Sequence, residues 1–405
     1  MRGLSQPSRQ LIKLRRCQPV LQRALTPISP TVRCGSYSSS ASNVSSPSTP
    51  DSHMDFEAIR AEMMARPPQI HTDEMDFRNA RLLTKALSEF LPEDCLPQVD
   101  LPQSEVSPVV RRQLPPYFPP GYHLVYFPLG LRGSQLCPDG TDPYHSPRGT
   151  PFTRRMWAGG SLQGLRSLKL NGKAAACVEE IADVRAQGPA GSEKIFVEVE
   201  RNYIYPLSNG PGPKLRYREK IRRFLKNPSQ NGRVGIAERR TLVFMREPSD
   251  EEKKISLDKE QKILRPPFTP TYSVTLTPTP TFLFHYSALS YNAHRIHLDR
   301  SYCREVEGYR DLLVHGPLSL TLMLSVLQSQ LPNGDTNGSF IDSVDYRHLA
   351  PLYVNQPMRV CCAPRSGNVQ DQWSIWVENQ DGGLCVMGTA IIKPLTDSKQ
   401  NETEN

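Results

Sequence analysis

Residues 286–320 hold side chains that can carry acid–base chemistry. The stretch reads YSALSYNAHRIHLDRSYCREVEGYRDLLVHGPLSL and contains three histidines, an asparagine and several carboxylates. A histidine changes its charge near neutral pH, so it can act as a general base, and its neutral imidazole also binds metal ions. The stretch therefore indicates an acid–base site, a metal site or a crowded polar surface.

A metal site would use His294, His297 and Asp299, because imidazoles three residues apart can share one face of a helix. No second cluster with the spacing of metal ligands stands nearby in the sequence. We therefore expect no metal. The plainer alternative for His294 or His285 is a structural or surface histidine.

The order of residues favours acid–base chemistry. About eighteen residues after His297, the segment VHGPLSLTLML predicts a buried helix that begins near Gly316 and Pro317. Free amides at a helix start can polarise a carbonyl oxygen, and a histidine base beside them can remove a proton alpha to a thioester. This combination predicts addition or elimination of water at a 2,3 double bond. Alternatively, HGPL only opens a core helix.

Hydrophobic periodicity predicts the elements that position these residues. Apolar residues recur at steps of three and four from Met75 to Phe90, which indicates a helix after a candidate cap at Asp73. The segments KIFVEVERNYIY and RRTLVFMRE alternate with a period of two and predict antiparallel strands, and YHLVYFPLGL is strand-like in composition. WSIWVENQ and LCVMGTAII flank DGG, which is a hairpin signal.

The pattern of strands and helices restarts near residue 270, which predicts two α+β domains at 55–250 and 266–396. The charged segment 251–265 is expected to link them, and residues 397–405 to form a disordered tail.

Residues 1–50 differ from the rest of the chain in composition. They hold seven Lys/Arg and no acid, so the formal net charge of +8 leaves +8 − 7 = +1 for the remainder. Basic and apolar residues mix in RQLIKLRRCQPVLQRAL, and a Ser/Pro-rich stretch follows. This composition predicts a mitochondrial transit peptide with a disordered tether, and hence the matrix, whereas a plain basic tail is the alternative.

Several classes of function find no support. Because residues after 50 are almost neutral, we expect no nucleic-acid partner. The chain lacks an apolar run near eighteen residues, so no membrane span is expected. No nucleotide-binding fingerprint, P-loop or nucleophile elbow occurs, and we expect no cofactor. Nine cysteines without a CxxC pair are expected to be reduced thiols.

The stretch around His297 resembles the active-site segment of hot-dog-fold hydratases and dehydratases, the MaoC-like and (R)-specific enoyl hydratase group. Their motif runs Tyr, a small stretch, Asp, any residue, Asn-Pro, any residue, His, with a later His-Gly at a central helix. Together, TRRMWAGG, NAHRIHLD, VEGY and LVHGPL are similar to the fungal mitochondrial 3-hydroxyacyl-thioester dehydratase type 2 family, and also to mesaconyl-C4-CoA hydratases.

This resemblance covers most of residues 70–396. It implies an α+β double hot-dog fold, in which two curved antiparallel sheets each wrap a central helix. It also implies that His297 is the catalytic base, that the Gly316 amide faces the thioester oxygen, and that Tyr286 is the leading aromatic. His294 and His315 are further candidates for contact with the substrate.

Asn292 is a departure from the motif, because it stands where the family has a catalytic Asp. An amide cannot shuttle a proton at neutral pH, although it can hold the attacking or departing water. Acid chemistry would then fall to His297 in both steps, to His294, to Asp299 or to a bound water. The same departure leaves a non-catalytic binding role open.

Two other segments hold candidates. DGTDPYHSP, residues 139–147, mimics the motif, but Gly140 falls at the position of the Asp and turn formers predict a loop with a structural His145. In RRMWAGG, Trp157 and Gly159 could shape an acyl tunnel and Arg155 could contact phosphates. Alternatively, Gly159-Gly160 begins the first domain's central helix.

The resemblance implies a (3R)-hydroxyacyl-thioester dehydratase of mitochondrial type II fatty-acid synthesis, supplying octanoyl groups for lipoate. The alternatives are a CoA hydratase of the mesaconyl type and a non-catalytic thioester-binding subunit. Expected partners are acyl carrier protein or CoA thioesters, with a possible homodimer. A basic rim could steer an acidic carrier protein, and its candidates are Arg154, Arg155, Arg295 and Arg300.

Overall fold

The computed structural model describes residues 54–97, 117–189, 191–204, 219, 234–258, 263–332, 338–365 and 371–395. The chain from Met54 onward forms one compact unit. Within it, the segments predicted as two domains are treated below as the N-terminal and C-terminal halves. The expected transit peptide, tether and C-terminal tail lie outside the described residues.

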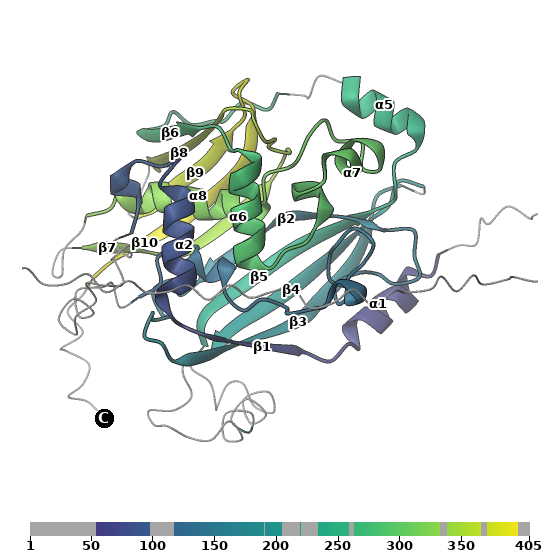
Figure 1. Ribbon diagram of the computed structural model, residues 1–405, viewed down its shortest axis with the longest axis horizontal. Helices are drawn as coiled ribbons and strands as arrows, with labels where there is room; N and C mark the ends of the chain where they lie inside the picture. The colour runs from purple at the N-terminus through teal and green to yellow at the C-terminus, as the bar shows by residue number, and fades with distance from the viewer. Residues whose placement is uncertain are drawn as a thin grey trace, which may run out of the picture. The chain divides into compact units, whose positions relative to one another are not determined.

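Ten strands form one antiparallel sheet in the order β1-β3-β4-β5-β2-β7-β10-β9-β8-β6 (Figure 1). The N-terminal half contributes β1 to β5 and the C-terminal half β6 to β10. Their bounds are β1 Gln69–Glu74, β2 Arg154–Gln163, β3 Ala174–Gln187, β4 Lys194–Ile204, β5 Val234–Met245, β6 Tyr272–Leu276, β7 Ser339–His348, β8 Met358–Pro364, β9 Gln372–Glu378 and β10 Leu384–Pro394.

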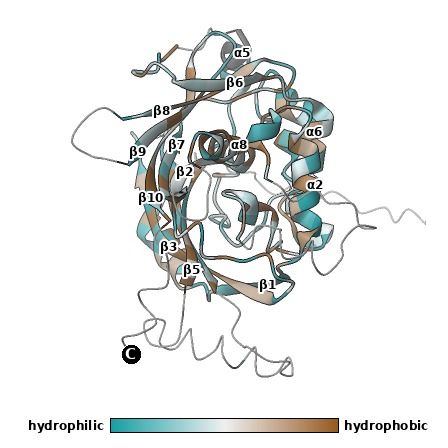
Figure 2. Ribbon diagram, turned by 90° about the vertical axis from the view of Figure 1, so that its left-hand side faces the viewer, coloured by the Kyte–Doolittle hydropathy of each residue, from teal (hydrophilic) through white to brown (hydrophobic). Residues whose placement is uncertain are grey.

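Each half repeats one strand order. Counted within its half, the sequence across the sheet is first, third, fourth, fifth, second strand, and the two second strands, β2 and β7, pair with each other. This repetition, with helices between the first and second strands of each half, is the α+β double hot-dog arrangement. The predicted pair of sheets is therefore joined edge to edge into a single curved sheet (Figure 2).

Gly159 and Gly160 lie in β2, at the junction of the halves, where this strand pairs with both β5 and β7. A Cβ on Gly159 would overlap the carbonyl oxygen of Tyr346, and one on Gly160 would overlap that of Arg239. The glycine pair therefore permits close strand approach. The alternative that this pair begins a helix is wrong.

In the described residues, the α-helices are α1 Phe56–Met64, α2 Phe77–Leu87, α5 Asp250–Asp258, α6 Pro280–Ser290, α7 Arg300–Glu305 and α8 Gly316–Ser329. The short 3₁₀ helices of these ranges are η1 Glu93–Cys95, η4 Tyr122–Val125, η5 Gly133–Gln135 and η6 Arg295–His297. Helix α8 lies inside the curve of the sheet, with α2 and α6 beyond it (Figure 2).

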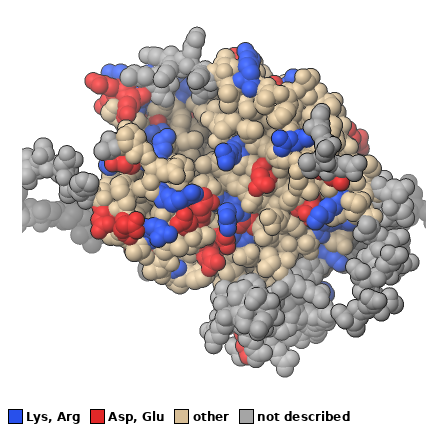
Figure 3. Space-filling model, turned by 180° about the vertical axis from the view of Figure 1, so that it is seen from behind, with Lys and Arg blue, Asp and Glu red and all other residues tan. Residues whose placement is uncertain are grey.

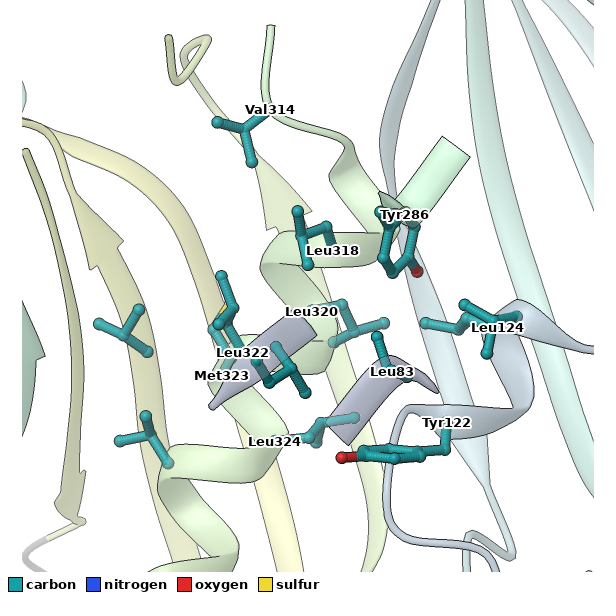
Figure 4. Close-up of a cluster of buried hydrophobic side chains, with 14 of the residues drawn as sticks. Leu83, Tyr122, Leu124, Tyr286, Val314, Leu318, Leu320, Leu322, Met323 and Leu324 are labelled. Atoms are coloured by element: carbon teal, nitrogen blue, oxygen red, sulfur yellow. The ribbon is translucent and has the colours of Figure 1, made fainter. Parts of the chain in front are cut away.

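Helix α8 is apolar on all sides, which suits a helix covered by protein in every direction. All residues from Leu318 to Leu327 are buried. Their side chains meet the sheet on one side and Leu83, Tyr122 and Leu124 on the other (Figure 4). Pro317 occupies the first turn of the helix, where its missing N–H costs nothing. The predicted buried helix at GPLSLTLML is confirmed.

Other local predictions have mixed outcomes. The strands β4 and β5 and the β9–β10 hairpin are confirmed. The helix predicted at Met75–Phe90 is the shorter α2, and Asp76 rather than Asp73 caps it. Asp73 instead lies in β1. The charged segment after residue 250 contains α5, which the sequence reading did not predict.

The strand predicted for YHLVYFPLGL is wrong, because this segment contains the 3₁₀ helix η4. Gly121, just before η4, and Phe127, two residues after it, both have positive φ angles (+84° and +57°). These angles turn the chain away from an extended path. The apolar side chains from Tyr122 to Phe127 are buried in the core that also includes α8, as Figure 4 shows for Tyr122 and Leu124.

Candidate active site

One cavity of about 550 Å³ is lined by residues from both halves. The C-terminal half contributes the loop after α6 and the start of α8, and the N-terminal half contributes β2 to β5 and the loop 124–145. Cavity-lining residues with polar or charged side chains include Asp142, His145, Arg155, Glu179, Arg201, Arg240, Ser287, Asn292, His294, His297 and His348.

His297 is buried at the wall of this cavity, in η6. Its Nδ1 lies 2.8 Å from the backbone carbonyl oxygen of Leu313. A carbonyl only accepts, so Nδ1 carries the proton and donates, and Nε2 is left with a lone pair. Burial lowers the pKa of His297 to about 4, so the imidazole is neutral at physiological pH. Its Nε2 can therefore act as a general base.

The loop that carries His297 is fixed by a helix end. Helix α6 ends at Ser290, and its C-cap residue Tyr291 has a left-handed conformation (φ +52°) that reverses the chain. Asn292 follows, and its Oδ1 accepts a hydrogen bond from the N–H of His294 at 3.0 Å. The same residue donates its backbone N–H to the carbonyl of Ser287 at 2.8 Å. Because Oδ1 already accepts the hydrogen bond from His294, the side chain of Asn292 can interact with a ligand in the cavity as a donor, through its NH₂ group.

Gly316 is the first residue of α8 and also lines the cavity. As a first-turn amide, its N–H has no acceptor within the helix and lies at the positive end of the helix dipole. A Cβ at this position would lie 3.2 Å from Nε2 of His348 and 3.3 Å from Cβ of Trp157. Because Gly316 has no Cβ, the space between its backbone and the side chains of His348 and Trp157 stays open.

His315 and Tyr286 lie behind the cavity wall and are not among its lining residues in the described part of the chain. His315 is fully buried, and its ring stacks on that of His297 with centroids 3.7 Å apart. Its Nε2 is 2.8 Å from Oγ of Ser287. Tyr286 is also buried, on α6. The roles predicted for both in substrate binding stay predictions.

His294 lines the cavity with its ring edge-on to that of His297, 5.5 Å between centroids. Its Nε2 lies 3.6 Å from Oδ2 of Asp139, but burial holds the pKa of His294 well below its ordinary value. The imidazole is therefore neutral, and this contact is not an ion pair.

The N-terminal wall of the cavity carries a buried ionic network. His145 places Nδ1 2.9 Å from Asp142 and Nε2 3.3 Å from Glu179. Arg201 forms an ion pair with Glu179, with Nε 2.8 Å from Oε2, and Arg155 donates a hydrogen bond to Asp142, also at 2.8 Å. Glu238, which is buried, pairs with Arg240 and accepts a hydrogen bond from Tyr203.

The two carboxylates beside His145 outweigh its burial and raise its pKa to about 9. The pKa of Glu179 lies well below its ordinary range because Arg201 and His145 offset its desolvation. His145 is therefore an imidazolium with both nitrogens engaged. This state rules it out as a general base.

The loop of Asp142 and His145 packs directly on the loop of His297. The N–H of Arg295 donates to the carbonyl of Asp139 at 2.8 Å. Gly140 has a left-handed φ of +85°, and a Cβ there would overlap the carbonyl oxygen of Ala293. The predicted loop is confirmed, and the structure brings its histidine to the cavity.

Among the other predicted residues, Arg155 and Trp157 line the cavity, whereas Gly159 belongs to the strand junction. Trp157 donates from Nε1 to the hydroxyl of Tyr346 at 3.0 Å, and the guanidinium of Arg240 lies 4.5 Å from its ring centroid. Trp157 is thus held in place from β5 and β7.

The four arginines predicted as a basic rim all have carboxylate partners. Arg154 pairs with Glu307, Arg155 with Asp142, Arg295 with Asp299 and Arg300 with Asp311. Basic and acidic side chains are also interspersed on the face shown in Figure 3.

In the described residues, no group of three or more His, Cys, Asp or Glu side chains is placed to hold a metal ion. All seven cysteines in these ranges are free. No helix in the described part of the chain is long and apolar enough to cross a membrane.

Comparison with solved structures supports the hot-dog fold. The crystal structure of a MaoC-like dehydratase from Phytophthora capsici matches with a TM-score of 0.52 and 15% sequence identity, over 84% of this chain and 99% of that chain. The chain belongs to the hydroxyacyl-thioester dehydratase type 2 family, whose model matches residues 121–354.

Two curated relatives give the same class of enzyme, the hydro-lyases. The mitochondrial hydroxyacyl-thioester dehydratase type 2 of Schizosaccharomyces pombe is 31% identical over 64% of this chain and 80% of its own length. The mesaconyl-C(4)-CoA hydratase of Chloroflexus aurantiacus is 28% identical over 68% of this chain and 83% of its own length.

The sequence reading missed Ser287 and most of the charged wall. A signal for the wall was present, because Arg201 shares the buried face of β4 with Val197 and Val199. Burying a charged side chain on the same strand face as valines costs folding free energy unless the charge is paired. Ser287 gave no such signal, since a serine on an apolar helix is usually a neutral choice.

Proposed function

We propose that the protein removes water from (3R)-3-hydroxyacyl thioesters to give trans-2-enoyl thioesters. His297 takes the proton from C2 at Nε2, and the Gly316 N–H donates to the thioester oxygen as negative charge develops there. The C3–O bond then breaks with its electron pair on oxygen, and His297 returns the proton to form water. Asn292 holds the leaving oxygen through its amide.

The observation that carries this proposal is the state of His297. Its tautomer is set by the Leu313 carbonyl and its charge by burial, so Nε2 is an unprotonated base at the cavity wall. Gly316, the first residue of an apolar helix, lines the same cavity. A base next to a preorganised amide is what enolate formation from a thioester requires.

The test is hydration of crotonyl-CoA by the full-length protein, followed by loss of enoyl-thioester absorbance. The expected result is turnover that falls about 10² to 10⁴-fold in His297→Ala, the range for a general base. His285→Ala is a matched control, since His285 is exposed on α6. An inert unmutated protein that still binds enoyl thioesters would instead support the non-catalytic subunit.

We further propose that the substrate is carried by acyl carrier protein in mitochondrial type II fatty-acid synthesis, in the matrix. The named relative from Schizosaccharomyces pombe is mitochondrial, and the basic, acid-free residues 1–50 suit a transit peptide. The check is kcat/KM for one acyl chain on carrier protein and on CoA. Equal values on the two carriers would argue against this assignment.

The charged N-terminal wall favours a second candidate, hydration of a short dicarboxylic acyl-CoA. Arg155, Arg201 and Arg240 line the cavity, and each is paired with a carboxylate of the wall. A guanidinium has five N–H donors, so those that the pairs leave over suit a carboxylate at the far end of the acyl group. The relative from Chloroflexus aurantiacus is named for such a substrate. Faster turnover of mesaconyl-C4-CoA than of crotonyl-CoA would select this candidate.

A further inference from the structure

Ser287 and His315 form a buried hydrogen-bonded pair at the cavity wall. Ser287 lies on α6 and lines the cavity, and His315 is the residue immediately before α8. Oγ of Ser287 is 2.8 Å from Nε2 of His315, and the two residues are 4% and 0% exposed. The mechanism above does not use this pair.

The proton of His315 can be placed from its surroundings. Its Nδ1 is buried and has no hydrogen-bond partner in the described residues. A buried N–H without an acceptor is rarer than a buried acceptor without a donor. Burial keeps the imidazole neutral, so its single proton lies on Nε2 and is donated to Oγ of Ser287.

The hydroxyl hydrogen of Ser287 is therefore not used by His315. The neighbouring Ser290 donates its own hydroxyl to the carbonyl of Tyr286, one turn back in α6, at 2.7 Å. Ser287 has no bond of that kind in the described part of the chain. Because Ser287 lines the cavity, its hydroxyl hydrogen is available to a ligand there.

Ser287 is also connected to two of the three residues proposed for the reaction, Asn292 and His297. The backbone N–H of Asn292 donates to its carbonyl oxygen at 2.8 Å. His315, its side-chain partner, stacks on His297 with ring centroids 3.7 Å apart. Ser287, Asn292 and His297 all line the same cavity.

We propose that Ser287 is a further catalytic residue, whose hydroxyl donates a hydrogen bond to the 3-oxygen of the substrate. This inference rests on the proposed function. In dehydration, Ser287 and Asn292 hold the leaving oxygen while the C3–O electron pair moves onto it and His297 delivers the proton. Ser287 keeps its own proton throughout. His315 is a positioning residue, because it fixes the direction of the Ser287 hydroxyl.

The experiment compares Ser287→Ala with Ser290→Ala in the full-length protein. For Ser287→Ala, kcat for crotonyl-CoA hydration is expected to fall about 10²-fold, the lower end for loss of one preorganised donor. Ser290→Ala removes a hydroxyl from the same helix that is already occupied, so a change of less than about threefold is expected. Butyryl-CoA, which lacks a 3-oxygen, serves as a competitive inhibitor, and its inhibition constant should be unchanged in Ser287→Ala.

The outcomes separate the two proposals. An unmutated protein without hydratase activity would refute the proposed function itself. An active protein whose Ser287→Ala variant keeps kcat within about threefold would overturn only the role of Ser287. A weaker inhibition by butyryl-CoA in proportion to the loss of kcat would show a structural role and also overturn it.

Ser287→Cys keeps the test decisive should the alanine variant not fold. Cysteine has nearly the same shape but a weak S–H donor. A loss of about tenfold or more in kcat, with unchanged butyryl-CoA inhibition, supports the hydroxyl as donor. Full activity of Ser287→Cys contradicts it.

Discussion

The two walls of the cavity carry histidines in opposite states. His297 on the C-terminal wall has its pKa lowered to about 4, and His145 on the N-terminal wall has its pKa raised to about 9. Both are buried, and both stand on loops between the first and second strands of their halves. Each also follows by five residues the position of the motif's Asp, which is Asn292 in one loop and Gly140 in the other.

The difference lies in the neighbours. His297 has a carbonyl at Nδ1 and stacks on the neutral His315, so burial dominates and the imidazole is neutral, with no proton on Nε2. His145 has a carboxylate at each nitrogen, and their attraction exceeds the cost of burial. The two similar motifs therefore differ in the state of their histidine, because His297 is a neutral base and His145 is a cation held between two carboxylates. The C-terminal wall is suited to proton transfer, and the N-terminal wall to a fixed electrostatic frame.

The largest effect is expected from breaking the charged wall. Glu179→Gln keeps the size of the side chain but removes the carboxylate nearest to Arg201 and one of the two carboxylates beside His145. We expect the free energy of unfolding to fall by about 3 to 5 kcal/mol, as for a broken buried ion pair. Chemical denaturation of the two proteins measures this change.

Glu200→Gln is the matched control for that substitution. Glu200 lies on β4 and pairs with Arg239 on β5, but both side chains are partly exposed. Removing this pair should cost less than about 1 kcal/mol. Equal losses in both variants would mean that the network around Glu179 contributes no more than a surface pair.

The acid limb of the pH profile tests the state of His297. Only the neutral form is a base, and its pKa is lowered to about 4. Activity is therefore expected to be constant from pH 7 to 5 and to fall as the pH drops through about 4. Because the folded pKa is below the unfolded one, protonation also favours unfolding between pH 6.5 and 4, so initial rates are measured after a brief pH jump.

Asn292→Asp sharpens this measurement, because it restores a carboxylate five residues before His297. An anion near the imidazole favours its charged form, so the acid limb should move up by about one pH unit. Asn292→Ala, which adds no charge, should leave the limb in place. If the acid limb of the unmutated protein has its midpoint near pH 6.5, the pKa of His297 is not lowered, and the contrast with His145 is contradicted.

The smallest effect is expected at the helix start. In Gly316→Ala, the new Cβ would lie 3.2 Å from His348 and 3.3 Å from Trp157, so neighbours must shift by a few tenths of an ångström. We expect kcat/KM to fall by about tenfold through displacement of the amide. At Gly133, which also borders the cavity, a Cβ would meet no atom within 4 Å. Unchanged kinetics in Gly316→Ala, as in Gly133→Ala, would argue against a tight fit at the amide.

Much of the C-terminal half was accessible from sequence, because its signals are local. The apolar run after Gly316 predicts α8, and DGG between alternating segments predicts the hairpin of β9 and β10. The N-terminal half was harder to predict, because its segments contradict their own composition. YHLVYFPLGL has strand-like residues but contains a buried 3₁₀ helix. Gly159 and Gly160 lie in a strand, where the backbones of neighbouring strands leave no room for a Cβ.

Spacing along the chain was enough to indicate the candidate base His297, the helix start at Gly316 and the Asn292 that replaces the motif's Asp. Folding brings His145 to the same cavity as His297 and makes one histidine charged and the other neutral, which spacing does not reveal. It also placed His315 behind Ser287 instead of in the cavity. The reason is physical, because a pKa or a hydrogen bond depends on groups from distant segments that meet only in the folded chain.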